Sequence, residues 1–167
     1  IKINTSDDLE YEIIIADENG NELPTGKTGE LLAKGPQVME EYWNKPEETA
    51  LVFVNGWLKT GDLGYIDEDG FVTIVDRKKD MIIISGFNVY PNEIEQVAVM
   101  HPGVLEAGAT GGVDDEGKEF VKLFIVKKDP DLTKDDILIH CRENLAAYKI
   151  PKVIEFRDAL PKTNVGK

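Results

Sequence analysis

The 167-residue chain has a single cysteine, two histidines and no long hydrophobic run. The lone cysteine, Cys141, excludes an internal disulfide, and its spacing from Leu138 and Leu145 favours core packing over catalysis. His101 and His140 have no neighbours typical of metal ligands, so no metal site is predicted. No apolar stretch approaches the roughly 18 residues of a membrane span, and no basic start followed by an apolar block indicates a signal peptide.

Positive charge is also scarce, because the chain has 19 basic and 32 acidic residues and a net charge of -13. This surface argues against nucleic acid as a partner, and an anionic ligand would need a local basic site. With 41% hydrophobic and 31% charged residues, the composition is that of a soluble globular protein. The chain begins with Ile1 and not with methionine, and we expect it to be a fragment of a longer protein.

The first half of the sequence reads as short antiparallel strands joined by glycine turns. An apolar run ends at Glu18-Asn19-Gly20, and Asp67-Glu68-Asp69-Gly70 separates two further β-rich segments. A short helical turn is predicted after Pro46. Together these signals predict an antiparallel, β-rich partial barrel or distorted sheet.

The second half predicts a compact α+β unit with a small sheet and two helices. "MIIISGFNVY" indicates strand, glycine turn and strand, and a helix follows that starts at Pro91 and stops before Pro102. A second helix is capped by Thr133 with Asp136 three residues later. The segments "EAGATGGV", "EFVKLFIVKK" and "VIEFRD" are predicted strands, so the fold class is α+β throughout.

Five consecutive charged residues, Asp76-Arg77-Lys78-Lys79-Asp80, separate the two halves. They indicate either a solvated connection between two strands or a hinge between two bodies that rotate. Charge alone favours the solvated connection.

Three segments carry residues that suit ligand chemistry. Asp62 follows a glycine, and its carboxylate has two acceptor oxygens for neighbouring hydroxyls such as those of a ribose. Gly86 suits a tight turn or the close approach of a thin ligand. Lys167 carries an ammonium that can neutralise a phosphate and a carboxylate together. Each residue taken alone is better explained as a turn or a terminus.

Taken in order, "NGWLKTGD", "VDRKKDMIIISGFNVYPNEIE" and "LPKTNVGK" resemble the C-terminal part of the adenylate-forming ligases. This superfamily contains acyl-CoA synthetases, luciferases and peptide-synthetase adenylation domains. Within it the sequence most resembles the long-chain-fatty-acid–CoA ligases, from about Asp17 to Lys167. The resemblance implies an acid–thiol ligase that joins a fatty acid to AMP, using ATP and Mg²⁺, and then transfers the acyl group to CoA.

The resemblance also implies two domains and a role for five residues. Residues 1–78 would end the large N-terminal domain, and residues 79–167 would form the small C-terminal domain, which rotates about a hinge near Lys79. Asp62 and Arg77 would hold the ribose of the nucleotide. Gly86 would line the passage for the pantetheine of CoA, and Lys167 would bridge the acid carboxylate and the α-phosphate.

The chain departs from the family pattern in several respects. The Gly/Ser/Thr-rich phosphate loop and the acyl pocket are not in this sequence, so we expect the chain alone to be inactive. Ile83 stands where some members have a lysine, and Asn88 stands where others have a basic or amide residue.

Several alternatives remain open from the sequence. The enzyme could act on aryl or medium-chain acids, or load a carrier protein. A non-catalytic module that binds nucleotide or a partner is a further alternative. The expected location is the cytoplasm; fatty substrates would allow peripheral contact with the inner membrane face, although no basic amphipathic helix supports it. The oligomeric state is not predicted.

Overall fold

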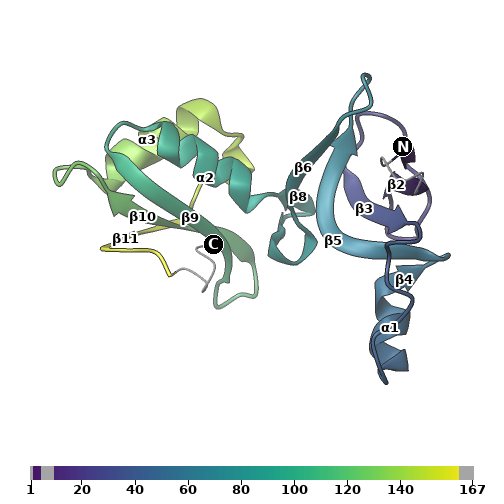
Figure 1. Cartoon of the computed structure of the whole chain (residues 1–167). Coiled ribbons are helices and arrows are strands. Elements are labelled where there is room, and N and C mark those ends of the chain that lie inside the picture. Colours follow the sequence, from purple (N-terminus) through teal and green to yellow (C-terminus); the bar gives the residue numbers. More distant parts are fainter. Residues whose placement is uncertain (1, 5–9, 162–167) are drawn as a thin grey trace. The chain divides into compact units, whose positions relative to one another are not determined.

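The computed structural model describes residues 2–4 and 10–161, and it divides the chain into two compact units (Figure 1). Unit 1 is Ile1–Lys79 and unit 2 is Asp80–Lys167. Each unit has its own sheet and its own hydrophobic core, so each is described by itself. The described helices are too short or too polar to cross a membrane.

Unit 1 is built on a curled antiparallel sheet, in which β5 bends strongly (Figure 1). Its strands are β1 (Lys2–Asn4), β2 (Glu10–Ala16), β3 (Gly29–Lys34), β4 (Phe53–Val54), β5 (Trp57–Ile66) and β6 (Val72–Arg77). The strand order is β1-β2-β3-β5-β4, and β6 pairs with β5. The predicted β-rich first half is therefore confirmed.

The predicted turns of unit 1 are stabilised by aspartate side chains. Asp17 Oδ1 accepts hydrogen bonds from the backbone N–H groups of Asn19 and Asn21, both at 2.9 Å. Asp67 Oδ1 accepts the corresponding bonds from Asp69 and Phe71, at 3.1 and 2.8 Å. In each turn the carboxylate accepts hydrogen bonds from backbone N–H groups that the sheet leaves without a partner. These bonds join residues close together in the sequence, so the turn positions could be predicted from the local sequence.

One short helix, α1 (Pro46–Val52), interrupts the strands of unit 1. Pro46 stands in its first turn with Glu47 and Glu48, which suits the positive end of the helix dipole. The helix buries none of its residues within the described chain. The helical turn predicted after Pro46 is confirmed.

Unit 2 combines a three-stranded sheet, a hairpin and two helices. The sheet contains β9 (Val104–Val113), β10 (Glu119–Lys127) and β11 (Val153–Arg157), in the order β11-β10-β9. The hairpin is β7 (Ile82–Ile84) with β8 (Phe87–Val89), and the helices are α2 (Pro91–Met100) and α3 (Lys134–Asn144). Single 3-10 turns are η1 (Lys78–Asp80), which spans the boundary between the units, and η2 (Ala147–Lys149).

Both helices of unit 2 begin where the sequence predicts. Pro91 lies in the first turn of α2, and the helix ends one residue before His101. Thr133 and Asp136 form a capping box at α3, in which the Thr133 side chain accepts a hydrogen bond from the Asp136 backbone at 3.2 Å. Asp136 accepts hydrogen bonds from the Thr133 hydroxyl and from the Thr133 backbone. Both lower the pKa of Asp136, and the bond from the hydroxyl has the larger effect.

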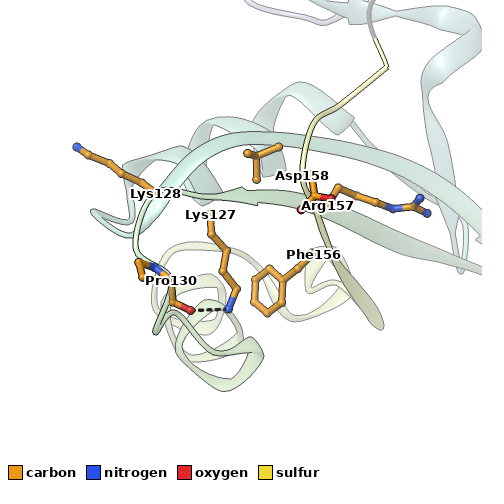
Figure 2. A pocket seen from close by; sticks show the side chains of 7 residues that line it. Lys127, Lys128, Pro130, Phe156, Arg157 and Asp158 are labelled. Atoms are coloured by element: carbon orange, nitrogen blue, oxygen red, sulfur yellow. Dashed lines mark hydrogen bonds between the residues drawn. The ribbon is translucent and has the colours of Figure 1, made fainter.

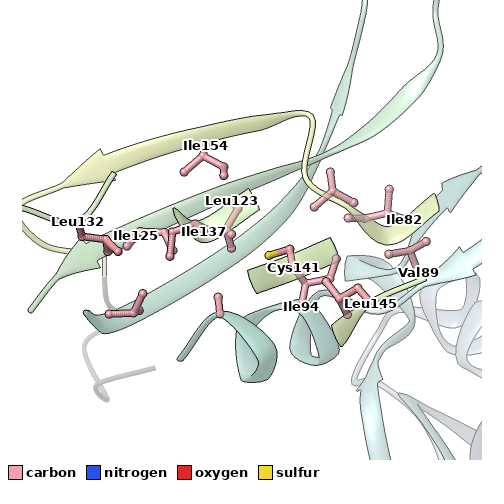
Figure 3. Packing of buried hydrophobic residues seen from close by; sticks show 13 residues of the cluster. Ile82, Val89, Ile94, Leu123, Ile125, Leu132, Ile137, Cys141, Leu145 and Ile154 are labelled. Carbon is pink, nitrogen blue, oxygen red and sulfur yellow. The ribbon is translucent and has the colours of Figure 1, made fainter. Parts of the chain in front are cut away.

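The core of unit 2 lies between the two helices and one face of the sheet (Figure 3). Ile94 from α2, Leu123 from β10 and Ile137 from α3 are fully buried there. Cys141 is also fully buried, as predicted for a core residue, and burial raises the pKa of its thiol. The predicted α+β unit with two helices is confirmed.

The charged run at residues 76–80 differs from the solvated connection that its charge favours. Asp76 and Arg77 are the last residues of β6, and Asp76 is only 5% exposed. The run begins inside the sheet because Asp76 and Arg77 pair with Leu63 and Asp62 of β5. The buried Asp76 carboxylate accepts a hydrogen bond from the Arg77 backbone at 2.7 Å and has further partners. The solvated-connection interpretation is therefore wrong for Asp76, which is buried, whereas Arg77 is exposed although it belongs to β6.

Candidate functional site

A bulge in β5 positions the predicted carboxylate. The single residue Leu31 of β3 faces residues 60–62 of β5, so β5 has two extra residues at this point. The Thr60 hydroxyl donates to the Leu31 carbonyl at 2.8 Å and accepts from the Asp62 backbone at 3.1 Å. Gly61 adopts a φ of 74°, a conformation that favours glycine. Bulges commonly redirect a side chain out of the regular strand pattern, and this one presents Asp62.

Asp62 and Arg77 face each other across β5 and β6. Their Cα atoms are register partners, and Asp62 Oδ1 lies 2.7 Å from Arg77 Nε. The Asp62 side chain is 30% exposed and that of Arg77 is 59% exposed, so the pair lies at the surface. A carboxylate has about four acceptor sites and a guanidinium has five donors, so one mutual contact leaves capacity for a polar ligand. The structure thus brings these two predicted residues together.

A depression of about 290 Å³ lies beside this pair, lined by Gly61, Arg77, Lys78 and Lys79. Apart from Gly61 and its chain neighbours, no atom lies within 4 Å of the position that a Cβ of Gly61 would take, so the depression is open at this residue. The three basic residues of the depression lie beside three carboxylates, those of Asp62, Glu30 and Asp76, so the site has both donors and acceptors for a polar ligand. Such a site suits a ligand that carries both an anionic group and hydroxyls.

Two buried carboxylates form hydrogen bonds with residues of the site, and the sequence analysis did not identify one of them. Glu30 is 7% exposed, and its Oε2 accepts from Lys78 Nζ at 2.8 Å. Asp76, the other buried acidic residue among those described, bonds the Arg77 backbone. Buried charges need partners, so these bonds fix the backbone of Arg77 and the side chain of Lys78. The signal for Glu30 was an acidic residue directly before the apolar run of residues 31–33 in the strand "GELLAK".

Gly86 lies in unit 2, at the tip of the β7–β8 hairpin. Ser85 and Gly86 form a two-residue turn with φ values of 51° and 84°, the pattern of a type I′ turn. The predicted tight turn is therefore confirmed. No atom lies within 4 Å of a Cβ built on Gly86, so the tip is open within unit 2. Ile83 and Asn88 are exposed register partners on the same hairpin.

The remaining predicted residues are Lys79 and Lys167. Lys79 is exposed and is the last residue of unit 1. Lys167 lies outside the described residues, so the structure does not place it. Among residues 12–161, no group of three or more His, Cys, Asp or Glu side chains is arranged to hold a metal ion.

A larger depression of about 560 Å³ lies in unit 2, but its charged side chains do not converge on one point (Figure 2). Lys127 Nζ donates to the Pro130 carbonyl at 3.0 Å and lies 4.2 Å from the Phe156 ring. Figure 2 shows Lys128 and Arg157 extending away from the depression in opposite directions. None of the predicted site residues lines it, so the Asp62–Arg77 site remains the candidate.

The family model for the AMP-binding enzyme C-terminal domain matches residues 93–167. The chain carries an AMP-binding enzyme C-terminal domain. This domain begins inside α2 and includes the three-stranded sheet of unit 2. The resemblance inferred from the sequence motifs is confirmed.

Curated relatives extend the similarity to both units. The long-chain-fatty-acid–CoA ligase of Escherichia coli O6:H1 is 56% identical over 156 residues, which are 93% of this chain and 28% of that protein. The ligase of the same name from Bacillus subtilis is 48% identical over 155 residues, 92% of this chain and 28% of that protein. The matched part of this chain thus spans 28% of the length of each of these relatives.

Solved structures share the fold. ATP-bound MatB from Rhodopseudomonas palustris matches with a TM-score of 0.88 and 40% identity, over 93% of this chain and 32% of that one. o-Succinylbenzoate CoA synthetase from Bacillus subtilis, in complex with its acyl-adenylate intermediate, matches with a TM-score of 0.84 and 39% identity. That match covers 94% of this chain and 32% of the synthetase. The α+β fold is therefore that of adenylate-forming enzymes.

Proposed function

We propose that this chain is the C-terminal part of an ATP-dependent acyl-CoA synthetase acting on long-chain fatty acids. In the first half-reaction the fatty acid carboxylate attacks the α-phosphorus of ATP, and pyrophosphate leaves. In the second the CoA thiol attacks the acyl carbonyl, and AMP leaves. The observation that carries the proposal is the pair between Asp62 on the β5 bulge and Arg77 at the end of β6, in a chain 56% identical to a ligase of this class.

Asp62 and Arg77 would hold the ribose of ATP and then of the acyl-adenylate. Vicinal hydroxyls donate to the two oxygens of one carboxylate, and a guanidinium at 2.7 Å keeps that carboxylate oriented. The neighbouring depression with Lys78 and Lys79 would favour the anionic part of the nucleotide. The bonds to Glu30 and Asp76 support this site because they fix it before the ligand arrives.

Lys79 and Gly86 would serve the change between the half-reactions. Lys79 ends unit 1, where a hinge would let unit 2 present a different face in each state. Gly86 would line the passage for pantetheine, and the open space around its Cα supports this role. A side chain at this tip would occupy the passage and block only the second step.

Lys167 would act in the first half-reaction, as the family resemblance implies. The carboxylate and the α-phosphate repel each other as they approach, so an ammonium between them lowers the barrier. Mg²⁺, supplied with ATP, would neutralise phosphate charge. The chain's own contributions are the ribose contacts, the hinge, the passage and the bridging ammonium.

The nucleotide site can be tested on the 167-residue chain by titrating it with AMP and recording amide chemical shifts. We expect shifts at residues 60–62 and 77–79, and we expect Asp62→Asn to abolish them. Asp114→Asn is the matched control, because the Asp114–Lys152 pair at 3.0 Å has side-chain exposures of 25% and 59%, close to those of Asp62 and Arg77. Shifts that survive in Asp62→Asn would contradict the assignment.

The reaction itself needs the upstream part of the enzyme. We expect no acid-dependent ATP–pyrophosphate exchange from the chain alone. Exchange should appear when the chain replaces the matching 156-residue segment of the Escherichia coli relative. Exchange by the isolated chain would contradict the expectation that it is inactive. A hybrid that folds but shows no exchange would contradict the proposed function.

A further inference from the structure

The β7–β8 hairpin, which carries Gly86, has only three residues in each strand. A two-stranded hairpin of this length is marginally stable in water and needs support from elsewhere. Ile82 and Val89, at the base of the hairpin, are 3% and 0% exposed and pack into the core of unit 2 (Figure 3). The base is therefore anchored, whereas the tip at Ser85 and Gly86 stands away from the core.

The tip is supported by an aromatic stack. Phe87 follows Gly86 directly, and its ring lies 4.8 Å from the Tyr148 ring at an interplanar angle of 24°. Phe87 pairs with Ile84 and faces the same side of the hairpin as Val89, so the stack continues the supported face toward the turn. Phe87 is 55% exposed and Tyr148 37% exposed, so this contact is outside the buried core.

Tyr148 is itself held in place by the next residue. It lies in η2, and Lys149 Nζ contacts both carboxylate oxygens of Glu93, at 2.7 and 2.5 Å. The Lys149 side chain is 15% exposed and that of Glu93 is 41% exposed, so this ion pair is partly shielded from solvent. Glu93 lies in the first turn of α2, which begins two residues after β8 ends.

These contacts form a closed circuit: hairpin tip, Phe87, Tyr148, Lys149, Glu93 and back through α2 to the hairpin. We propose that Tyr148 and Lys149 are positioning residues, which hold the Gly86 turn in the geometry required for transfer of the acyl group to the CoA thiol. This inference rests on the proposed function. It predicts that loss of either residue slows the second half-reaction and spares the first, in which the Gly86 passage has no part.

The brace itself can be measured on the 167-residue chain by amide hydrogen exchange. In Tyr148→Ala we expect faster exchange across residues 82–89, by up to about tenfold from loss of the stack. Tyr148→Phe keeps the ring and should exchange like the unaltered chain. Amides of β10 should be unaffected in both variants, since a general loss of stability would raise their exchange as well.

Lys149→Met distinguishes a brace from a direct contact between Tyr148 and CoA. If these contacts together hold the hairpin, this variant shows the same faster hairpin exchange as Tyr148→Ala. In the double variant the increase in exchange is then smaller than the sum of the two single effects. Lys118→Met is the matched control, because Lys118 pairs with Glu116 at 2.6 Å on an exposed turn of the same unit. Unchanged hairpin exchange in Lys149→Met and Tyr148→Ala would overturn the brace.

The functional arm uses the hybrid with the Escherichia coli relative. We expect Tyr148→Ala to reduce acyl-CoA formation from supplied acyl-adenylate by about tenfold or more, with ATP–pyrophosphate exchange unchanged and Tyr148→Phe restoring transfer. Equal loss of both steps would overturn the positioning role while leaving the proposed function intact. An inactive unaltered hybrid would overturn the proposed function and this role together, and the exchange data would still show whether the brace exists.

Discussion

At the scale of single residues, this chain requires glycine for two distinct physical reasons. Gly86 has a φ of 84° with open space around its Cα, so the backbone conformation alone demands it. Gly64 has no such φ, but a Cβ there would lie 2.5 Å from the Thr73 carbonyl oxygen of the neighbouring strand. The first kind of glycine can be predicted from a turn sequence, whereas the second depends on long-range pairing.

Gly117 provides a matched control for Gly86. It also has a positive φ, 78°, and open space around its Cα. We expect Gly86→Ala and Gly117→Ala to destabilise unit 2 similarly, by about 1 kcal/mol, because both force an L-residue into the left-handed region. Urea unfolding measures this, and a difference of several-fold between the two would contradict the backbone explanation.

The same pair separates stability from function in the hybrid enzyme. Gly86→Leu should block acyl transfer to CoA and spare ATP–pyrophosphate exchange, while Gly117→Leu should spare both. A block of transfer by Gly117→Leu would show that lost stability, and not an obstructed passage, explains the effect.

The capping box of α3 makes a prediction about acid stability. The Thr133 hydroxyl and backbone lower the pKa of Asp136 in the folded state, so this carboxylate stabilises the fold above about pH 4, the ordinary value for aspartate. That contribution is lost as the pH falls through the lowered folded-state pKa. We expect Thr133→Ala to raise the pKa of Asp136 and to flatten the acid limb of stability, measured by carbon-13 titration and by urea unfolding at several pH values.

Asp114 serves as the internal reference in that titration. Its pKa is lowered chiefly by the hydrogen bond from the Lys152 side chain, which Thr133→Ala does not touch. A shift of Asp114 together with Asp136 would indicate a general structural change and would count against the capping explanation.

At the scale of elements, local signals were sufficient for turns and helix starts but not for strand pairing. Pro91, Thr133 and the Ser85-Gly86 turn act within a few residues of chain, so their positions could be predicted. The bulge at residues 60–62 was not predicted, because it arises from the register between β3 and β5. The parallel pairing of β11 with β10 was not predicted for the same reason.

The candidate site shows the same division between local and long-range information. Asp62 and Arg77 were found through family motifs, and their contact follows from the antiparallel pairing of β5 and β6. The support that Lys78 receives from Glu30 joins residues 48 positions apart in the sequence. No local pattern encodes such a pair, since each partner alone is an ordinary surface residue type.

Gly64 allows a test of strand packing between β5 and β6. We expect Gly64→Ala to destabilise unit 1 by about 1–3 kcal/mol, because the added methyl group overlaps a backbone oxygen that cannot move without breaking the pairing. Gly26→Ala, which has a φ of 79° and open space, should cost about 1 kcal/mol through backbone conformation alone. Urea unfolding followed by tryptophan fluorescence measures both, and a smaller loss for Gly64→Ala would contradict the packing argument.

At the scale of the whole molecule, the two units have separate cores and separate natural reporters. Both tryptophans, Trp43 and Trp57, lie in unit 1, and Trp57 packs against its core. The single cysteine, Cys141, is buried in the core of unit 2. Fluorescence therefore follows the unfolding of unit 1, and thiol labelling follows the opening of unit 2.

Leu123→Ala tests whether the units unfold independently. This residue is fully buried in unit 2, so its truncation should cost about 2–5 kcal/mol there. We expect Cys141 to become labelled at a lower urea concentration, with the tryptophan transition unchanged. A parallel shift of both transitions would show that the two units unfold as one cooperative body.

The parallel strand β11 has a consequence for the order in which the protein folds during synthesis. The described strands of unit 1 are complete once Arg77 has been made, whereas the sheet of unit 2 must wait for Val153–Arg157, which supply the core residue Ile154. N-terminal segments generally fold first on the ribosome. Nascent unit 2 would therefore carry an unpaired edge of β10 until Val153–Arg157 have been made, and during this interval that edge is available for incorrect strand pairing.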